Sequence, residues 1–203
     1  MTAFIEHESL LSDDQHGFRS GKNTGSAHLS LNNKIIENFQ DGSASLVLFL
    51  DFQRAFETLD RGLLLTKLER MGFRGKAQDL LRSYFQNRRQ FTYVNGVFSP
   101  SVNCDIGTPQ GSNFGPMCFA LYLNDIFKLF DDSVGVVGYA DDCAIIISGR
   151  DTDKLVSKMN EILARLTDWC DYNKLAINIS KTKYMFVTNR VVMDYPICIR
   201  NES

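Results

Sequence analysis

Residues 134–148 read Val-Gly-Val-Val-Gly-Tyr-Ala-Asp-Asp-Cys-Ala-Ile-Ile-Ile-Ser. Two short apolar runs, rich in β-branched residues, flank the adjacent carboxylates Asp141 and Asp142. Such runs are typical of β-strands, so the stretch predicts a hairpin with two acids at its turn. An unpaired carboxylate is costly to bury. The two acids therefore either lie beside a cation, most simply a divalent metal, or form a solvated turn.

The composition is that of a globular protein and excludes several classes. The chain has 203 residues, is 44% hydrophobic and has a net charge of −2. It is long enough for one large domain, and any basic surface that binds nucleic acid must be local. Its five scattered Cys fit free thiols in a reducing compartment better than a zinc site. The sequence shows neither a signal peptide nor an apolar run long enough to span a membrane.

Local patterns predict an α+β fold. Helical periodicity predicts helices over 25–39, 60–71, 76–86, 112–130 and 152–173. Strand patterns cover 46–50, 91–94 with an Asn95-Gly96 turn, the 134–148 hairpin, 175–179 and 184–187. The first 23 residues are expected to form a polar loop that leads to an N-cap at Thr24. Helices that alternate with antiparallel strands favour a small sheet with helices on one face.

A second carboxylate follows the apolar run 46–50. A continuous apolar run is typical of a strand that is buried on both faces, and this run ends directly in Asp51. If that strand neighbours the hairpin in one sheet, Asp51 and Asp141 meet at the sheet's end. Two carboxylates with open positions for phosphate oxygens suit a two-Mg²⁺ site, which indicates phosphoryl transfer.

Five motifs resemble those of reverse transcriptases, most closely jockey-like non-LTR retrotransposons (LINEs). They are Gln15-His16-Gly17-Phe18-Arg19, 51–60, 107–116, Tyr139-Ala140-Asp141-Asp142 and 175–183, in family order. The resemblance implies a polymerase palm, a ferredoxin-like antiparallel sheet with helices on one face, over 41–190. Partial fingers would occupy 1–40, and 191–203 would begin the primer-grip region.

The resemblance also implies roles for the acids and their neighbours. Asp51 and Asp141 would ligate both metal ions, with Asp142 supporting the site. Phe56, five residues after Asp51, would lie against the sugar and exclude a 2′-hydroxyl, although an aromatic residue there also suits a core. Arg19 would reach the triphosphate, unless it is a surface residue.

Further roles fall on a loop and a turn. In the Gly- and Pro-rich loop 107–112, Gln110 and Gly111 would lie along the incoming nucleotide and template, or Gln110 would cap the loop. Pro109 and Tyr139 would contact nucleic acid. Lys181 would approach the pyrophosphate, in competition with Lys183. A local basic cluster of Arg82, Arg88 and Arg89 would touch the nucleic-acid backbone or form a solvated face.

These implications predict an RNA-directed DNA polymerase that extends a DNA primer on an RNA template with dNTPs. Its cofactor would be two Mg²⁺ ions, with Mn²⁺ as an alternative. The alternatives are an RNA-templated RNA polymerase, a maturase-type reverse transcriptase, and a non-catalytic transposon-derived remnant. We expect a fragment without thumb or complete fingers. The family implies an intracellular protein, in the nucleus at some stage; the sequence does not indicate an oligomeric state.

Overall fold

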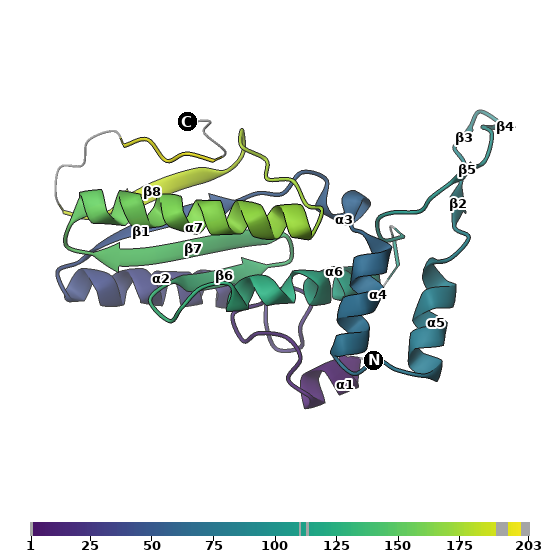
Figure 1. Cartoon of the computed structure of the whole chain (residues 1–203), viewed down its shortest axis with the longest axis horizontal. Helices are drawn as coiled ribbons and strands as arrows, with labels where there is room; N and C mark the ends of the chain where they lie inside the picture. The colour runs from purple at the N-terminus through teal and green to yellow at the C-terminus, as the bar shows by residue number, and fades with distance from the viewer. Residues whose placement is uncertain (1, 110, 113, 190–194, 200–203) are drawn as a thin grey trace.

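A four-stranded antiparallel sheet forms the centre of the protein (Figure 1). In this computed structural model, which describes residues 2–109, 111–112, 114–189 and 195–199, the strand order is β6-β7-β1-β8. The bounds are Ala44–Leu50 for β1, Gly135–Tyr139 for β6, Asp142–Gly149 for β7 and Lys183–Val187 for β8. The predicted strand 46–50 and the predicted hairpin are therefore neighbours in one sheet.

Helices cover both faces of this sheet. The long helix α7 (Thr152–Tyr172) buries one apolar stripe on the first face: Leu155, Met159, Ile162, Leu163 and Leu166. On the other face, Leu31 and Ile35 of α2 (Thr24–Gln40) pack against Val47, Ala144 and Ile146. The expectation of helices on one face is thus wrong. The reason lies in β1, whose uninterrupted apolar run has side chains on both faces to bury.

The remaining helices pack at the end of the sheet that carries the acids. They are α3 (Ala55–Thr58), α4 (Arg61–Arg70), α5 (Lys76–Phe85) and α6 (Gly115–Leu123), followed by the 3₁₀ helix η1 (Asn124–Lys128). Nearly all of α6 is buried, so it is the central helix of this part. The helix predicted over 112–130 is therefore shorter and ends in a tighter turn.

Two small ribbons project from the body beyond α5 (Figure 1). They pair β2 (Arg89–Gln90) with β5 (Val102–Asn103), and β3 (Tyr93–Val94) with β4 (Val97–Phe98). The Asn95-Gly96 turn predicted from sequence joins β3 to β4, and both of its residues have positive φ.

Three local expectations were wrong. A short helix, α1 (Thr2–His7), lies in the predicted loop; Ile5 is its one buried residue, so it leaves no periodic apolar signal. The stretch 175–179 forms an isolated bridge, Phe52↔Ile177, and no strand, because the segment that pairs with it is short and turns into α3 at Ala55. The N-cap of α2 is Asn23, whose side chain accepts a hydrogen bond from the Ser26 N–H. Within the described ranges, no helix is long and apolar enough to cross a membrane.

Candidate active site

The acids predicted to act together lie at one end of two paired strands. The β1–β7 pairing ends at Leu50↔Cys143, so Asp51 and Asp142 are the next residue on each strand. Asp141 occupies the two-residue turn that joins β6 to β7. The 175–183 stretch holds Asp51 from the other side: the Asn178 N–H donates to the Asp51 carbonyl at 2.8 Å. The fold thus gathers three of the sequence-predicted residues from two distant segments.

The pKa of Asp141 is shifted by its burial and by the neighbouring acids. Burial raises the pKa of the half-buried Asp141 carboxyl above its usual range, against the lowering effect of its own backbone N–H. The negative charges of Asp142, Asp51 and Glu57 raise that pKa further. A carboxylate with raised pKa among other carboxylates is a group that a cation would stabilise.

The donor chemistry fits a hard divalent cation. Mg²⁺ prefers carboxylate oxygens and takes one or two of them together with substrate phosphates. Among the residues that the structure describes, no group of three or more His, Cys, Asp or Glu is arranged to hold a metal ion. A pair of carboxylates would leave positions for oxygens from other molecules.

The glycine-rich loop is fixed against α3, directly after Asp51. The Gly107 N–H donates to the Leu59 carbonyl at 2.7 Å, and the Thr108 N–H donates to the Phe56 carbonyl at 2.9 Å. Arg61, which is buried, donates from Nε to the Gly107 carbonyl at 2.7 Å and from Nη1 to the Cys104 carbonyl. The loop therefore begins at a defined position beside the acids.

Phe56 is held by two other aromatic rings. Its ring lies 4.4 Å from the ring of Phe119, centroid to centroid, and 6.4 Å from that of Phe18 in an edge arrangement. Phe119 is fully buried, whereas Phe56 is half-buried. Phe56 thus lies at the boundary of the core, packed against Phe119 and partly exposed.

The family comparison agrees with this geometry. The sequence matches the family described as reverse transcriptase (RNA-dependent DNA polymerase) over residues 1–195. The chain belongs to the reverse transcriptase family. The resemblance drawn from its five motifs is therefore confirmed.

Curated relatives of this reverse transcriptase chain include proteins from mobile elements. It is 28% identical over 179 residues to the probable RNA-directed DNA polymerase from transposon BS of Drosophila melanogaster, covering 85% of this chain and 20% of that protein. It is 25% identical over 182 residues to the RNA-directed DNA polymerase from mobile element jockey of the same species, covering 87% and 20%. The chain thus spans about a fifth of the length of these relatives.

Solved structures with a similar fold include telomerases. The apo telomerase from Candida tropicalis truncated from its C-terminal domain superposes with a TM-score of 0.64 at 13% identity, covering 91% of this chain and 38% of that chain. The telomerase from Candida albicans in complex with a fragment of telomeric RNA gives 0.65 at 12% identity, covering 91% and 33%. The reverse transcriptase chain therefore has the mixed helix and antiparallel sheet fold of telomerase.

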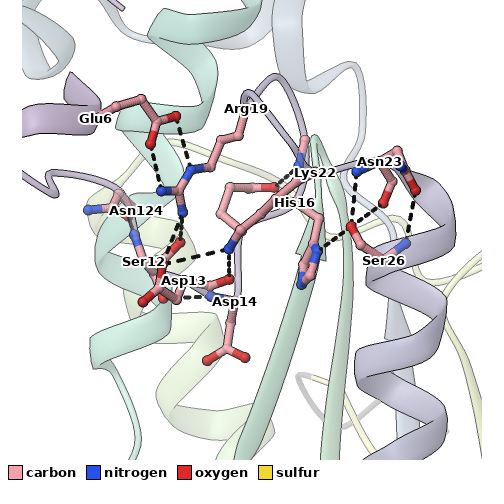
Figure 2. A network of polar contacts seen from close by, with 12 residues as sticks. Glu6, Ser12, Asp13, Asp14, His16, Arg19, Lys22, Asn23, Ser26 and Asn124 are labelled. Carbon is pink, nitrogen blue, oxygen red and sulfur yellow. Dashed lines mark hydrogen bonds and ion pairs between the residues drawn. The ribbon is translucent and has the colours of Figure 1, made fainter. Parts of the chain in front are cut away.

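Arg19 is engaged elsewhere than the family resemblance implies (Figure 2). Its guanidinium, with a side-chain exposure of 8%, donates to the Glu6 carboxylate at 2.8 Å and to the Ser12 carbonyl at 2.7 Å. The hydrogen bond between Arg19 and Glu6 lowers the pKa of Glu6 and raises the pKa of Arg19. In this structure Arg19 anchors α1 to the following loop, because α1 supplies a carboxylate that sequence reasoning did not detect.

The other sequence-predicted residues of the site that the structure describes are half-buried or exposed. Tyr139 is half-buried and lines a groove of about 260 Å³ with Phe49 and Asp142. Lys181 is exposed in the turn before β8. Pro109 is half-buried and Gly111 is exposed with φ of +76°, while Gln110 lies outside the described residues.

Sequence reasoning missed three contributors to this site. Glu57, within the 51–60 motif, was assigned no role, yet its charge raises the pKa of Asp141. Arg61, to which sequence reasoning assigned no role, holds the Gly107 loop through a hydrogen bond to the Gly107 carbonyl. Gln15, in the first motif, is only 1% exposed and bonds to the acidic turn. Only its motif membership marked it, because the contact joins segments 125 residues apart.

Proposed function

We propose that this chain forms the polymerase centre of an RNA-directed DNA polymerase from a non-LTR retrotransposon. It would extend a DNA primer with dNTPs along an RNA template. The observation that carries the proposal is the position of Asp51 and Asp141 at one end of the paired strands β1 and β7. In this proposal the sheet β6-β7-β1-β8 is the palm, within residues 41–190, and residues 1–40 belong to the fingers.

Asp51 and Asp141 are the residues that would hold the metal ions, with Asp142 supporting them. Two Mg²⁺ ions, or Mn²⁺ in their place, would neutralise the charge on the attacking 3′-oxygen and on the departing pyrophosphate. The protein's own contribution is to orient these two carboxylates and to concentrate negative charge beside them. Such positioning and charge neutralisation account for most catalysis of phosphoryl transfer.

The neighbouring residues would bind the substrates. The half-buried Phe56 would lie against the sugar and reject a 2′-hydroxyl, which its contact with Phe119 supports by fixing the ring. Gln110, Gly111 and Pro109 would line the path of the nucleotide and template, and Tyr139 would contact nucleic acid beside Asp142. Lys181 is exposed and belongs to the 175–183 stretch that holds Asp51, and it would approach the pyrophosphate.

Two measurements on the full chain test the proposal. The first is primer extension on an RNA template with dNTPs and Mg²⁺, and the second is calorimetric titration with Mn²⁺. Wild type should extend the primer and bind Mn²⁺, whereas Asp141→Asn should do neither. Asp132→Asn, at the opposite end of β6, is the matched control and should behave as wild type. Mn²⁺ binding that persists in Asp141→Asn would refute the metal assignment, and absence of binding in wild type would favour a remnant without turnover.

A further inference from the structure

The turn that carries Asp141 has an unfavourable backbone conformation. Tyr139 and Asp142 pair across the hairpin, which leaves Ala140 and Asp141 as a two-residue turn. Ala140 has φ of +60°, in the left-handed region. For a residue with a Cβ this region costs about 1–2 kcal/mol, and hairpin turns of this kind favour Asn or Gly. The conformation of this turn therefore needs support from outside the hairpin.

The side chain of Gln15 supplies that support. Its Oε1 accepts from the Ala140 N–H at 3.2 Å, and its Nε2 donates to the Ala140 carbonyl at 3.4 Å. The same Oε1 accepts from the Gly17 N–H at 2.8 Å, which orients the amide. Both backbone polar groups of Ala140 are thus satisfied by one buried side chain.

The backbone around Gln15 also pairs with β6. We call residues 14–18 the Gln15 loop. The Gly138 N–H donates to the Asp14 carbonyl at 2.9 Å, and the His16 N–H donates to the Gly138 carbonyl at 2.8 Å. A Cβ on Gly17 would lie 2.2 Å from the Ala140 nitrogen. The backbone of the loop therefore packs so closely against the hairpin turn that position 17 has no room for a side chain.

The Gln15 loop is itself fixed at both ends (Figure 2). Before it, the Ser12 N–H donates to Oδ1 of Asn124, a buried residue of η1, at 2.8 Å. Within it, His16 Nδ1 lies 2.8 Å from the Ser26 hydroxyl of α2. These contacts join the loop to η1 and α2, two elements outside the hairpin. Gln15 is consequently held by segments other than the turn that it supports.

We propose that Gln15 is a positioning residue that sets the direction of the Asp141 carboxylate. By holding Ala140 in the left-handed conformation, it fixes the next residue of the turn relative to Asp51. The inference rests on the proposed metal-binding role of Asp141. Phe18 of the same loop contacts Phe56, so the Gln15 loop supports both the acid and the aromatic residue of the site.

Two readouts on the full chain test this role. Hydrogen–deuterium exchange, measured without metal, should be faster at residues 138–142 in Gln15→Ala than in wild type. Titration with Mn²⁺ should show affinity weakened about 10-fold or more, as for other residues that orient metal ligands. In the Gln15→Ala background, Ala140→Gly removes the left-handed penalty and should restore part of the lost affinity.

Gln78→Ala is the matched control. Gln78 is also buried and donates to a backbone carbonyl, that of Leu65, at 3.1 Å, but it lies away from the acids. Gln78→Ala should lower stability and leave both readouts at the hairpin unchanged. Equal Mn²⁺ affinity in wild type and Gln15→Ala would overturn the role of Gln15 and leave the proposed function intact. The same conclusion would follow if Gln78→Ala lost as much Mn²⁺ affinity as Gln15→Ala. A wild-type chain that binds no Mn²⁺ would overturn the proposed function instead.

Discussion

A Cβ on Gly107 would lie 2.5 Å from the carbonyl oxygen of Glu57. Gly107 also has φ of +73°, so the position excludes side chains for two independent reasons. This close approach joins the glycine-rich loop to α3, the helix that follows Asp51. The relationship ties two of the family motifs into one rigid unit.

Gly107→Ala should therefore be strongly destabilising. We expect a loss of about 2–5 kcal/mol in the free energy of unfolding, from the left-handed penalty together with the collision. Urea unfolding measures it. Gly21→Ala is the control, because Gly21 has φ of +75° with open space around it, and should lose only about 1–2 kcal/mol. Equal losses in the two variants would show that α3 and the loop move apart freely.

Arg61→Lys should also lower stability, although the charge is kept. The guanidinium of Arg61 donates to the Gly107, Phe85 and Cys104 carbonyls, and one ammonium group cannot reach all three. We expect a loss of about 1.5–3 kcal/mol, the range for hydrogen bonds to charged groups. Arg74→Lys, at an exposed arginine with one weak bond, should change stability by less than about 0.5 kcal/mol. If the unfolding midpoint of Arg61→Lys equalled that of wild type, the three hydrogen bonds of the guanidinium would not contribute to stability.

Asp141→Asn should stabilise the metal-free chain at neutral pH. The folded-state pKa of Asp141 is raised, so its contribution to stability is present below the ordinary carboxyl pKa and is lost as pH rises through the folded value. The melting temperature of the variant should therefore exceed that of wild type at pH 7.

The difference should shrink as the pH falls below the ordinary pKa of a carboxyl, where the wild-type carboxyl is protonated in both the folded and the unfolded chain. Scanning calorimetry in EDTA at several pH values measures it, with Asp132→Asn as the control. A variant that is less stable than wild type at pH 7 would contradict the electrostatic explanation. Added Mg²⁺ should raise the melting temperature of wild type and of Asp132→Asn, but not that of Asp141→Asn, which lacks one of the two proposed ligands.

Phe56→Val should relax discrimination between sugars. A smaller side chain leaves room for a 2′-hydroxyl, so the ratio of ATP affinity to dATP affinity should rise, measured by titration with Mn²⁺ present. Phe73→Val is the control for destabilisation, because Phe73 is buried against Phe4 away from the acids. It should leave the ratio unchanged. An unaltered ratio in Phe56→Val would remove the sugar role from this residue.

The sequence was informative where the pattern was local. The stripe from Leu155 to Leu166 predicts α7, and the runs around Asp141 predict the hairpin, because each signal lies within one element. The meeting of Asp51 with the hairpin could be expected from the motifs, and strand pairing bears it out.

Contacts between distant segments could not be predicted in this way. The pairing of Arg19 with Glu6 depended on α1, whose six residues carry no periodic signal. The bonds from Gln15 to Ala140 follow from tertiary packing, and nothing around either residue indicates the other. The helix α2 on the second face of the sheet was missed, because the apolar pattern of a strand does not indicate which element covers each of its faces.

The place of β1 in the sheet has a consequence for folding. Both of its neighbours, β7 and β8, come later in the chain, so β1 has no strand partner until residue 142 and beyond have been synthesised. Long-range strand pairing is slow because the loop-closure entropy must be overcome first. The apolar segment Leu46–Leu50 therefore stays without a strand partner until β7 has been made, and the end of the sheet that carries Asp51 and Asp141 cannot assemble before then.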